Sequence, residues 1–312
     1  MPEEEDIMTA PLVSAIVPTF DRAWCIGRAI ESVLAQTYRS LEFLVVDDAS
    51  TDDTASVLKD VEEKRRRQGG DRVISLEVLR RDARGGVSAA RNTGIRRARG
   101  ALIAFLDSDD EWLPEKTARQ VALHLRNPGL MLSQTGERWM RRGAFVNPPK
   151  RLEKTAGDLF ERSLAFCAVS PSAVMLRREI FDDVGLFDES FPACEDYEMW
   201  LRVTCRHEVG LVPQPLVVKH GGHEDQLSST VEALDRHRIR AIVKALRSNL
   251  LSSDQHALAL AALQMKCRIY GQGCRKRGRE DEAREVLSLP ERLREGVAGP
   301  RRRRDRGRDV WS

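Results

Sequence analysis

The sequence predicts an α/β protein whose central, mostly parallel sheet is covered by helices on both faces. Three segments, residues 12–18, 41–46 and 101–106, are strand-length and almost wholly apolar. Helical segments separate them along the chain. Strands that are apolar on both faces and alternate with helices are typical of a buried parallel sheet. The chain of 312 residues is long enough for one such domain with a smaller appendage.

The first strand, residues 12–18, is rich in β-branched residues and ends at Pro18. Asp21 follows and can cap a helix over residues 25–36, whose apolar residues fall on one face. The second strand, residues 41–46, comes next. These segments predict a β, α, β unit.

The alternation then continues and weakens from about Met131. The further elements expected are a helix over residues 54–67, a strand over 73–79, a helix over 88–99, a strand over 101–106, strand candidates over 130–134, 173–176 and 211–218, and helices over 231–249, 257–270 and 280–287. We therefore expect four segments: a disordered N-terminus over residues 1–11, an α/β domain over 12–228, a helical appendage over 229–297 and a disordered Arg-rich tail over 298–312.

Composition and charge narrow the class of protein. The net charge of +3 is small, and its basic excess lies in the tail at residues 301–308. That tail can contact an anionic membrane surface or stay solvated, and we expect no nucleic-acid partner. Six cysteines occur without C-x-x-C spacing, the N-terminus is acidic, and no run of about 18 apolar residues occurs. We expect a cytoplasmic protein with at most peripheral contact at the inner membrane face.

An acidic motif follows the third apolar strand, where Asp107, Asp109 and Asp110 come directly after residues 101–106. Open α/β sheets bind their ligands at the carboxyl ends of their strands. Crowded carboxylates repel one another, and a hard cation such as Mg²⁺ or Mn²⁺ removes that repulsion while diphosphate oxygens complete its shell. A solvated acidic turn that caps the next helix is the alternative.

A second acidic loop, at Asp47 and Asp48, follows the strand at residues 41–46 in the same way. Both loops should lie along one edge of one sheet. A carboxylate there can accept hydrogen bonds from a ribose hydroxyl or a base N–H. Ser50 and Asp52 can instead cap the next helix.

The sequence resembles the family 2 glycosyltransferases of the GT-A fold on six motifs that occur in the expected order. They are residues 17–22 (VPTFDR), 47–54 (DDASTDDT), 86–94 (GVSAARNTG), 107–114 (DSDDEWLP), 185–188 (GLFD) and 195–202 (EDYEMWLR). The resemblance covers roughly residues 12–228. It implies the transfer of a sugar from a nucleotide-diphosphate donor, commonly a UDP-sugar, to a carbohydrate or lipid-linked acceptor.

The resemblance also assigns the donor side of the site. It implies that Asp48 contacts the donor nucleotide and that Asp109 is the principal carboxylate on Mn²⁺ or Mg²⁺, with Asp107 beginning the D-x-D signature. Arg91 lies in the motif that faces the donor pyrophosphate or sugar. The first motif adds Pro18 and Asp21 to the donor-binding residues.

On the acceptor side, the resemblance places Asp196 at the position of the general base of inverting members, with Glu195 beside it. A carboxylate that takes the proton of an acceptor hydroxyl as the new bond forms is ordinary general-base catalysis. An amphipathic helix with an acidic start explains the same residues without catalysis. His220 and His223 precede Ser228, and similar enzymes use a histidine there to complete the metal shell or touch the donor phosphates. A surface loop with incidental histidines is the alternative.

Three other functions agree less well with the sequence. A dehydrogenase needs a G-x-G-x-x-G turn after the first strand, and Pro18 to Trp24 contain no glycine. A sugar-phosphate nucleotidyltransferase would open with a glycine-rich phosphate loop, which is absent, so it ranks second. A scaffold with the same fold but no turnover, acting through its helical end, would have no reason to gather Asp107, Asp109 and Asp196.

Overall fold

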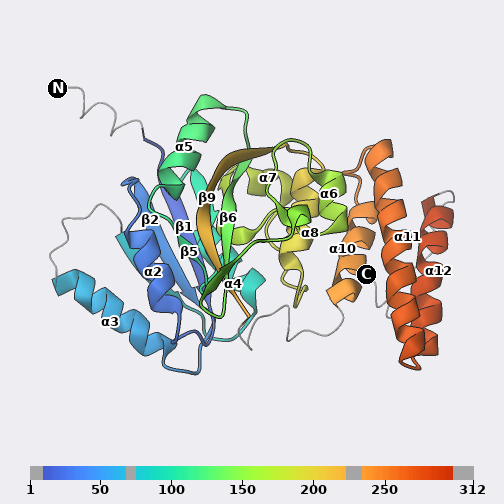
Figure 1. The fold of residues 1–312 in the computed structure, drawn as a ribbon, viewed down its shortest axis with the longest axis horizontal. Coiled ribbons are helices and arrows are strands. Elements are labelled where there is room, and N and C mark those ends of the chain that lie inside the picture. The colour runs from blue at the N-terminus through green and yellow to red at the C-terminus, as the bar shows by residue number, and fades with distance from the viewer. Residues whose placement is uncertain (1–9, 68–74, 223–233, 298–312) are drawn as a thin grey trace.

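The computed structural model describes residues 10–67, 75–222 and 234–297, and its centre is one mixed β-sheet (Figure 1). The strands are β1 (Val13–Thr19), β2 (Leu41–Asp47), β3 (Ser75–Arg80), β4 (Leu102–Phe105), β5 (Glu111–Trp112), β6 (Leu132–Arg141), β7 (Ala144–Val146), β8 (Val174–Arg177) and β9 (Val209–Gly221). Their order across the sheet is β3, β2, β1, β4, β8, β6, β9, β5, with β7 beside β6.

The first half of the sheet is parallel, as predicted. β1 pairs in parallel with β2 and β4, and β2 pairs in parallel with β3. β8 inserts between β4 and β6 and is antiparallel to both, so β6 and its parallel partner β9 run in the direction of β4. β5 and β7 also run antiparallel to their neighbours. The reversed strands are short, and two of them, β7 and β8, lie in the part of the chain where the alternation weakened.

Helices cover both faces of this sheet. They are α2 (Ile26–Leu34), α3 (Thr54–Arg67), α4 (Val87–Arg97), α5 (Lys116–Arg126), α6 (Phe160–Ala165), α7 (Ile180–Val184) and α8 (Glu195–Thr204), with 3-10 turns η1 (Lys150–Leu152) and η2 (Pro171–Ala173). Val13 and Val17 of β1 pack in one apolar cluster with α2, α3 and α5. Ile16 packs in the other, with α4, α7 and α8. Burial on both faces explains why these strands are continuously apolar.

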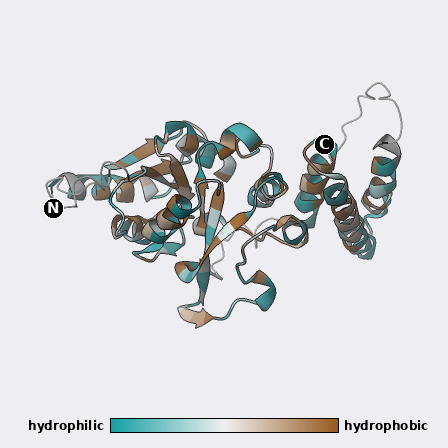
Figure 2. Cartoon of the chain, turned by 90° about the horizontal axis from the view of Figure 1, so that it is seen from above, coloured by the Kyte–Doolittle hydropathy of each residue, from teal (hydrophilic) through white to brown (hydrophobic). Residues whose placement is uncertain are grey.

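A bundle of three helices, α10 (Leu234–Arg247), α11 (Ser253–Lys276) and α12 (Glu280–Val297), follows the sheet domain. It lies beyond α6 and α8, in orange and red in Figure 1. Figure 2 shows hydrophobic residues running along the central strands and along these helices. The bundle shares a hydrophobic cluster with Leu164 of α6 and with Tyr197 and Leu201 of α8. The expected appendage is therefore helical, and it packs directly on the sheet domain.

Several predicted segments fall outside the described residues: 1–9 of the N-terminus, 223–233 with His223, and 298–312 of the Arg-rich tail. Within the ranges that the structure describes, no helix has the length and hydrophobicity needed to cross a membrane.

The buried His124 of α5 should make the stability of the protein depend on pH. Its Nδ1 lies 3.2 Å from the Leu130 carbonyl and its Nε2 lies 3.0 Å from the Ser133 hydroxyl. Burial lowers the pKa of His124 from 6.5 to about 4, and the charge of Arg177 adds to this effect. Below pH 6.5 His124 binds a proton in the unfolded chain but not in the folded chain. The free energy of unfolding therefore decreases as the pH falls from 6.5 towards 4. Denaturant unfolding between pH 6.5 and 4 measures this effect. The free energy of unfolding of His124→Gln should depend less on pH than that of the wild type, and an equal dependence would contradict the lowered pKa of His124.

Candidate active site

The carboxyl ends of β1, β2 and β4 lie at one edge of the sheet because these strands are parallel. The loop after β1 carries Asp21, the loop after β2 begins with Asp48, and the loop after β4 carries Asp107 and Asp109. The prediction that both acidic loops share one sheet edge is therefore confirmed. Open α/β sheets bind their ligands at this edge.

Asp21 ties the loop after β1 to the loop after β2. Its φ is 50°, and its Oδ1 accepts hydrogen bonds from the backbone N–H groups of Thr51 at 2.7 Å and Asp52 at 3.2 Å. α2 instead begins after Cys25, whose side chain makes no cap bond. The expected Asp21 helix cap is wrong, because the carboxylate reaches donors in the other loop. Asp52 lies two residues before Thr54, the first residue of α3, and its Oδ1 accepts from the Thr54 N–H at 2.9 Å.

Asp48 is buried and holds the loop that precedes α4. Its Oδ1 accepts from Arg81 Nη1 at 2.8 Å and from the Gly85 N–H at 3.0 Å, while its Oδ2 accepts from the Gly86 N–H at 2.7 Å. Gly86 has a φ of 87°, a conformation that favours glycine. Asp48 therefore shapes the mouth of the site, and its contact with a nucleotide stays a prediction.

The three aspartates after β4 differ in their surroundings. Asp110 is buried, and its carboxylate accepts from Ser172 Oγ at 2.6 Å and from the His220 N–H at 3.1 Å. Burial raises the pKa of Asp110 well above its usual value, although Lys219 opposes the rise. Asp107 and Asp109 are only partly buried. Asp110 thus anchors the loop, whereas the two residues of the D-x-D signature keep part of their surface exposed.

Arg91 of α4 is the central cation of the site. Its Nη2 lies 2.8 Å from Asp107 Oδ1, and its Nη1 lies 2.7 Å from Glu195 Oε1. The side chain is 3% exposed. Burial would lower the pKa of Arg91, but the two carboxylates outweigh it and raise the pKa. One guanidinium therefore joins the D-x-D loop to the start of α8.

Glu195 and Asp196 are consecutive, yet they have different partners. Burial and the charge of Asp196 raise the pKa of Glu195, and Arg91 opposes the rise. Asp196 is half-buried; its Oδ1 accepts from the Tyr197 N–H at 2.7 Å, and its Oδ2 lies 3.2 Å from Cys167 Sγ. Glu195 is thus committed to an ion pair, whereas Asp196 has only neutral donors among the contacts that the structure describes.

The end of β9 forms another wall of the site. His220 Nε2 lies 2.5 Å from Glu111 Oε1. Burial would lower the pKa of Lys219, but Glu137 and the aspartates after β4 raise it. The ammonium of Lys219 is therefore a fixed positive charge within electrostatic reach of the D-x-D loop. His223 lies outside the described residues, so its predicted role at the metal is untested.

Several residues of this site escaped the sequence reasoning: Glu137, Lys154, Cys167, Ser172 and Lys219. Only Lys219 lies next to a residue that the sequence analysis names, since it directly precedes His220. The others lie outside the recognised motifs, and their pairing depends on how the antiparallel strands and the loop before η2 fold back.

The donor set for a metal consists of carboxylates. Among the described residues, no cluster of three or more His, Cys, Asp or Glu side chains could hold a metal ion by itself. Mg²⁺ is usually held by one or two carboxylates with substrate phosphates in the remaining positions. The partly exposed Asp107 and Asp109 fit a cation shared with a diphosphate better than one enclosed by protein.

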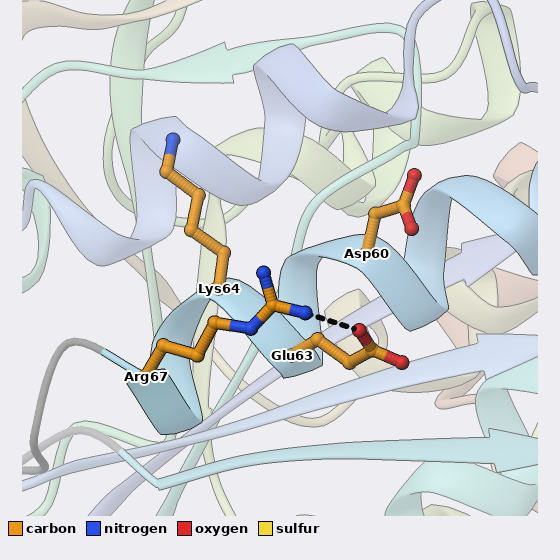
Figure 3. Close-up of a pocket in the computed structure, with 4 residues that line it drawn as sticks. All are labelled: Asp60, Glu63, Lys64 and Arg67. Atoms are coloured by element: carbon orange, nitrogen blue, oxygen red, sulfur yellow. Dashed lines mark hydrogen bonds and ion pairs between the residues drawn. The ribbon is translucent and has the colours of Figure 1, made fainter.

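A depression on the outer side of α3 has a different character. Its lining residues, Asp60, Glu63, Lys64 and Arg67, all come from one helix, and Arg67 pairs with Glu63 at 3.1 Å (Figure 3). Exposed pairs of this spacing are common on helix surfaces. We assign no chemistry to this depression.

Solved glycosyltransferases share this fold. TarS 1–349 of S. aureus, solved in complex with UDP-GlcNAc, has a TM-score of 0.63 at 18% identity, over 91% of this chain and 92% of that chain. The mannosyltransferase PcManGT from Pyrobaculum calidifontis, in complex with GDP-Man and Mn²⁺, has a TM-score of 0.58 at 18% identity, over 92% and 86%. The fold is the GT-A fold with C-terminal helices, as predicted.

The family follows from the sequence comparisons. The model of glycosyl transferase family 2 matches residues 14–185, which is more than half of the chain. The chain therefore belongs to glycosyl transferase family 2 and is a glycosyltransferase. One relative is the Escherichia coli enzyme named UDP-Glc:alpha-D-GlcNAc-diphosphoundecaprenol beta-1,3-glucosyltransferase WfaP, which is 30% identical over 62% of this chain and 70% of its own length.

Other relatives differ in length. An uncharacterized glycosyltransferase of Rickettsia typhi is 29% identical over 71% of this chain and 67% of its own length. The match spans only 58% of the Rickettsia prowazekii relative and 32% of the Rickettsia felis relative. These relatives therefore extend beyond the part that they share with this chain.

Proposed function

We propose that this chain transfers a sugar from a nucleoside diphosphate sugar, most simply a UDP-sugar, to an acceptor hydroxyl with inversion at the anomeric carbon. The buried Arg91 carries this proposal, since it joins Asp107 of the D-x-D loop to Glu195, the residue before Asp196. The side chain of Arg91 thereby fixes the D-x-D loop and the start of α8 relative to each other, as a site that uses both would require. The chemistry then follows from where each carboxylate sits.

The proposed reaction is one displacement. The acceptor oxygen forms a bond to C1 of the donor sugar, the bond from C1 to the diphosphate oxygen breaks, and its electron pair leaves with the nucleoside diphosphate. Asp196 takes the proton of the acceptor hydroxyl, which is a poor nucleophile without such a base. Glu195 is bonded to Arg91, so we assign it the positioning of α8 and not the proton transfer.

On the donor side, we propose that Pro18, Asp21 and Asp48 line the nucleotide pocket. Asp48 and Asp21 already hold the loops around it. Arg91 and Asp107 would face the diphosphate.

We propose that Asp109 and Asp107 hold Mn²⁺ or Mg²⁺ together with the donor diphosphate, and that His223 can complete the shell. Bound there, the cation would offset the charge that builds on the departing diphosphate. Lys219, within electrostatic reach of the same loop, adds a second positive charge from the protein itself.

For the acceptor, we propose a lipid-linked saccharide. The names of two Escherichia coli relatives, WfaP and WfgD, give α-D-GlcNAc-diphosphoundecaprenol as the acceptor and UDP-Glc as the donor. An acceptor of this kind lies in a membrane surface, and peripheral contact through the Arg-rich tail would bring the enzyme to it.

Titration calorimetry with UDP, GDP and dTDP, each with and without Mn²⁺, tests the donor site. We expect Mn²⁺-dependent binding of UDP, and we expect Asp109→Ala to weaken it at least about tenfold because a metal ligand is lost. Asp60→Ala, an exposed carboxylate of α3, is the matched control and should bind as the wild type does. UDP-glucose with a short-chain GlcNAc-diphospholipid then tests turnover by release of UDP.

Failure of all three nucleotides to bind would overturn the donor site and favour the scaffold function. Binding of GDP or dTDP in place of UDP would change the donor but keep the site. Release of pyrophosphate from a nucleoside triphosphate and a sugar phosphate would instead support a nucleotidyltransferase.

A further inference from the structure

A cysteine thiol lies directly against the proposed base. Cys167 belongs to the loop between α6 and η2, and its Sγ is 3.2 Å from Asp196 Oδ2 and 3.1 Å from the Val169 carbonyl oxygen. Both distances suit a hydrogen bond from sulfur. Burial and the charge of Asp196 raise the pKa of Cys167 well above its usual value. The thiol therefore keeps its proton, and that one proton has two acceptors.

A buried ion pair holds this loop in place. Lys154 Nζ lies 3.4 Å from Glu137 Oε1 and 3.3 Å from the Ala168 carbonyl oxygen, and these two charged side chains are 7% and 5% exposed. The Ser170 hydroxyl donates to the same Glu137 oxygen. Burial would raise the pKa of Glu137, but Lys154 and other donors lower it to about 2. The part of the loop that follows Cys167 is thus fastened to β6 by a charged, solvent-excluded pair.

We propose that Cys167 is a positioning residue for Asp196, and that the Glu137–Lys154 pair holds it there. The inference rests on the proposed function of Asp196. While Asp196 is ionised, the thiol donates to its Oδ2 and fixes the orientation of the carboxylate. When Asp196 takes the acceptor proton, the thiol rotates and donates to the Val169 carbonyl. A thiol is a weak donor, so this exchange opposes the proton transfer little.

Other titratable and charged groups surround this carboxylate and must be considered in any pH dependence. They are Glu195, Cys194 and Tyr197 on or beside α8, Arg91 behind Glu195, Lys154 and Lys219 facing Cys167, and Asp235 and Arg238 of α10 facing Cys194. Among the described residues, none of these groups donates a hydrogen bond to Asp196 Oδ2, which Cys167 contacts. Substitutions at Cys167 therefore change one direct donor and leave the other charges in place.

The test compares the pH dependence of kcat for Cys167→Ser and Cys167→Ala, with UDP-glucose and the short-chain GlcNAc-diphospholipid as substrates. A hydroxyl is a stronger donor than a thiol and stabilises the ionised carboxylate, so the acid limb should move to lower pH in Cys167→Ser. In Cys167→Ala the hydrogen bond to Asp196 is lost, so the acid limb of kcat should move to higher pH. On the acid side, the fraction of maximal rate should be about threefold higher in Cys167→Ser than in Cys167→Ala.

Cys205→Ser is the matched control. Its half-buried thiol donates to the Arg202 carbonyl at 3.2 Å at the other end of α8, so its acid limb should coincide with that of the wild type. Acid limbs that move together in Cys167→Ser and Cys167→Ala would overturn the proposal, because a purely structural cysteine has no reason to move them in opposite directions.

An infrared measurement keeps the inference separate from the proposed function. The S–H stretching band of Cys167, isolated as wild type minus Cys167→Ser, should shift when Asp196 is replaced by Asn. An unshifted band would show that the thiol does not donate to this carboxylate, whatever the reaction. A shifted band with full turnover in Asp196→Asn would instead support the contact and overturn Asp196 as the base.

Discussion

Asp196→Asn is expected to lower kcat at least about a hundredfold while leaving nucleotide binding intact, because a positioned base contributes this much or more to a transfer of this kind. Asparagine keeps the size of the side chain and an oxygen that can accept from the Tyr197 N–H, as Asp196 does at 2.7 Å. It cannot take a proton from the acceptor. Release of UDP from UDP-glucose in the presence of the GlcNAc-diphospholipid measures the rate, and calorimetry with UDP and Mn²⁺ measures the binding.

Asp254→Asn makes the same chemical change in the first turn of α11, where the side chain is exposed, and should keep the wild-type rate. Turnover of Asp196→Asn within a few-fold of wild type would remove Asp196 from the proposed reaction. The donor site would stand, because it depends on the other end of the Arg91 bridge.

Arg91→Met is expected to lower the free energy of unfolding by about 3–5 kcal/mol, the usual cost of leaving a buried charge without its partner. Glu195 is 8% exposed and lies 2.7 Å from Arg91, so it would be the stranded charge. We also expect loss of activity, since Asp107 and α8 would no longer be joined. Arg91→Lys keeps the charge but cannot reach both carboxylates with two separate N–H arms, so it should also lose activity.

Denaturant unfolding and the transferase assay together check this bridge. In the double variant Arg91→Met with Glu195→Gln, part of the lost stability should return because no charge is stranded, whereas activity should stay low. Equal stability of Arg91→Met and wild type would mean that the bridge is not formed in solution.

The parallel half of the sheet could be predicted because β1, β2 and β4 are buried on both faces. That burial makes each of them a continuous apolar segment, which is a local signal. The reversed strand β8 pairs with β4 on one side and β6 on the other. No residue pattern within β8 indicates which strands it pairs with or in which direction. Pairing across long sequence separations is decided by packing, not by local periodicity.

The same division applies to the site. The acidic residues of the motifs lie in the strand-end loops and at the helix start that the residue pattern predicted, but their partners come from elsewhere in the chain. Arg91 and Glu195 are 104 residues apart, and Cys167 and Asp196 are 29 apart. The expected cap by Asp21 failed for a related reason, since its carboxylate bonds to Thr51 across two loops.

The helical bundle, which lies in the last quarter of the chain, contacts α8 and so bears on the proposed catalysis. The Tyr197 hydroxyl donates to the Leu164 carbonyl at 2.7 Å, Lys266 Nζ donates to the Ala165 carbonyl at 3.1 Å, and Gln255 Nε2 donates to the Cys205 carbonyl at 2.9 Å. The bundle therefore contacts the end of α8 directly through Gln255, and it contacts α6, which packs on α8, through Lys266. Relatives that replace this bundle with other segments would keep the same reactive groups on a differently braced backbone, so the tuning of one transferase need not transfer to another.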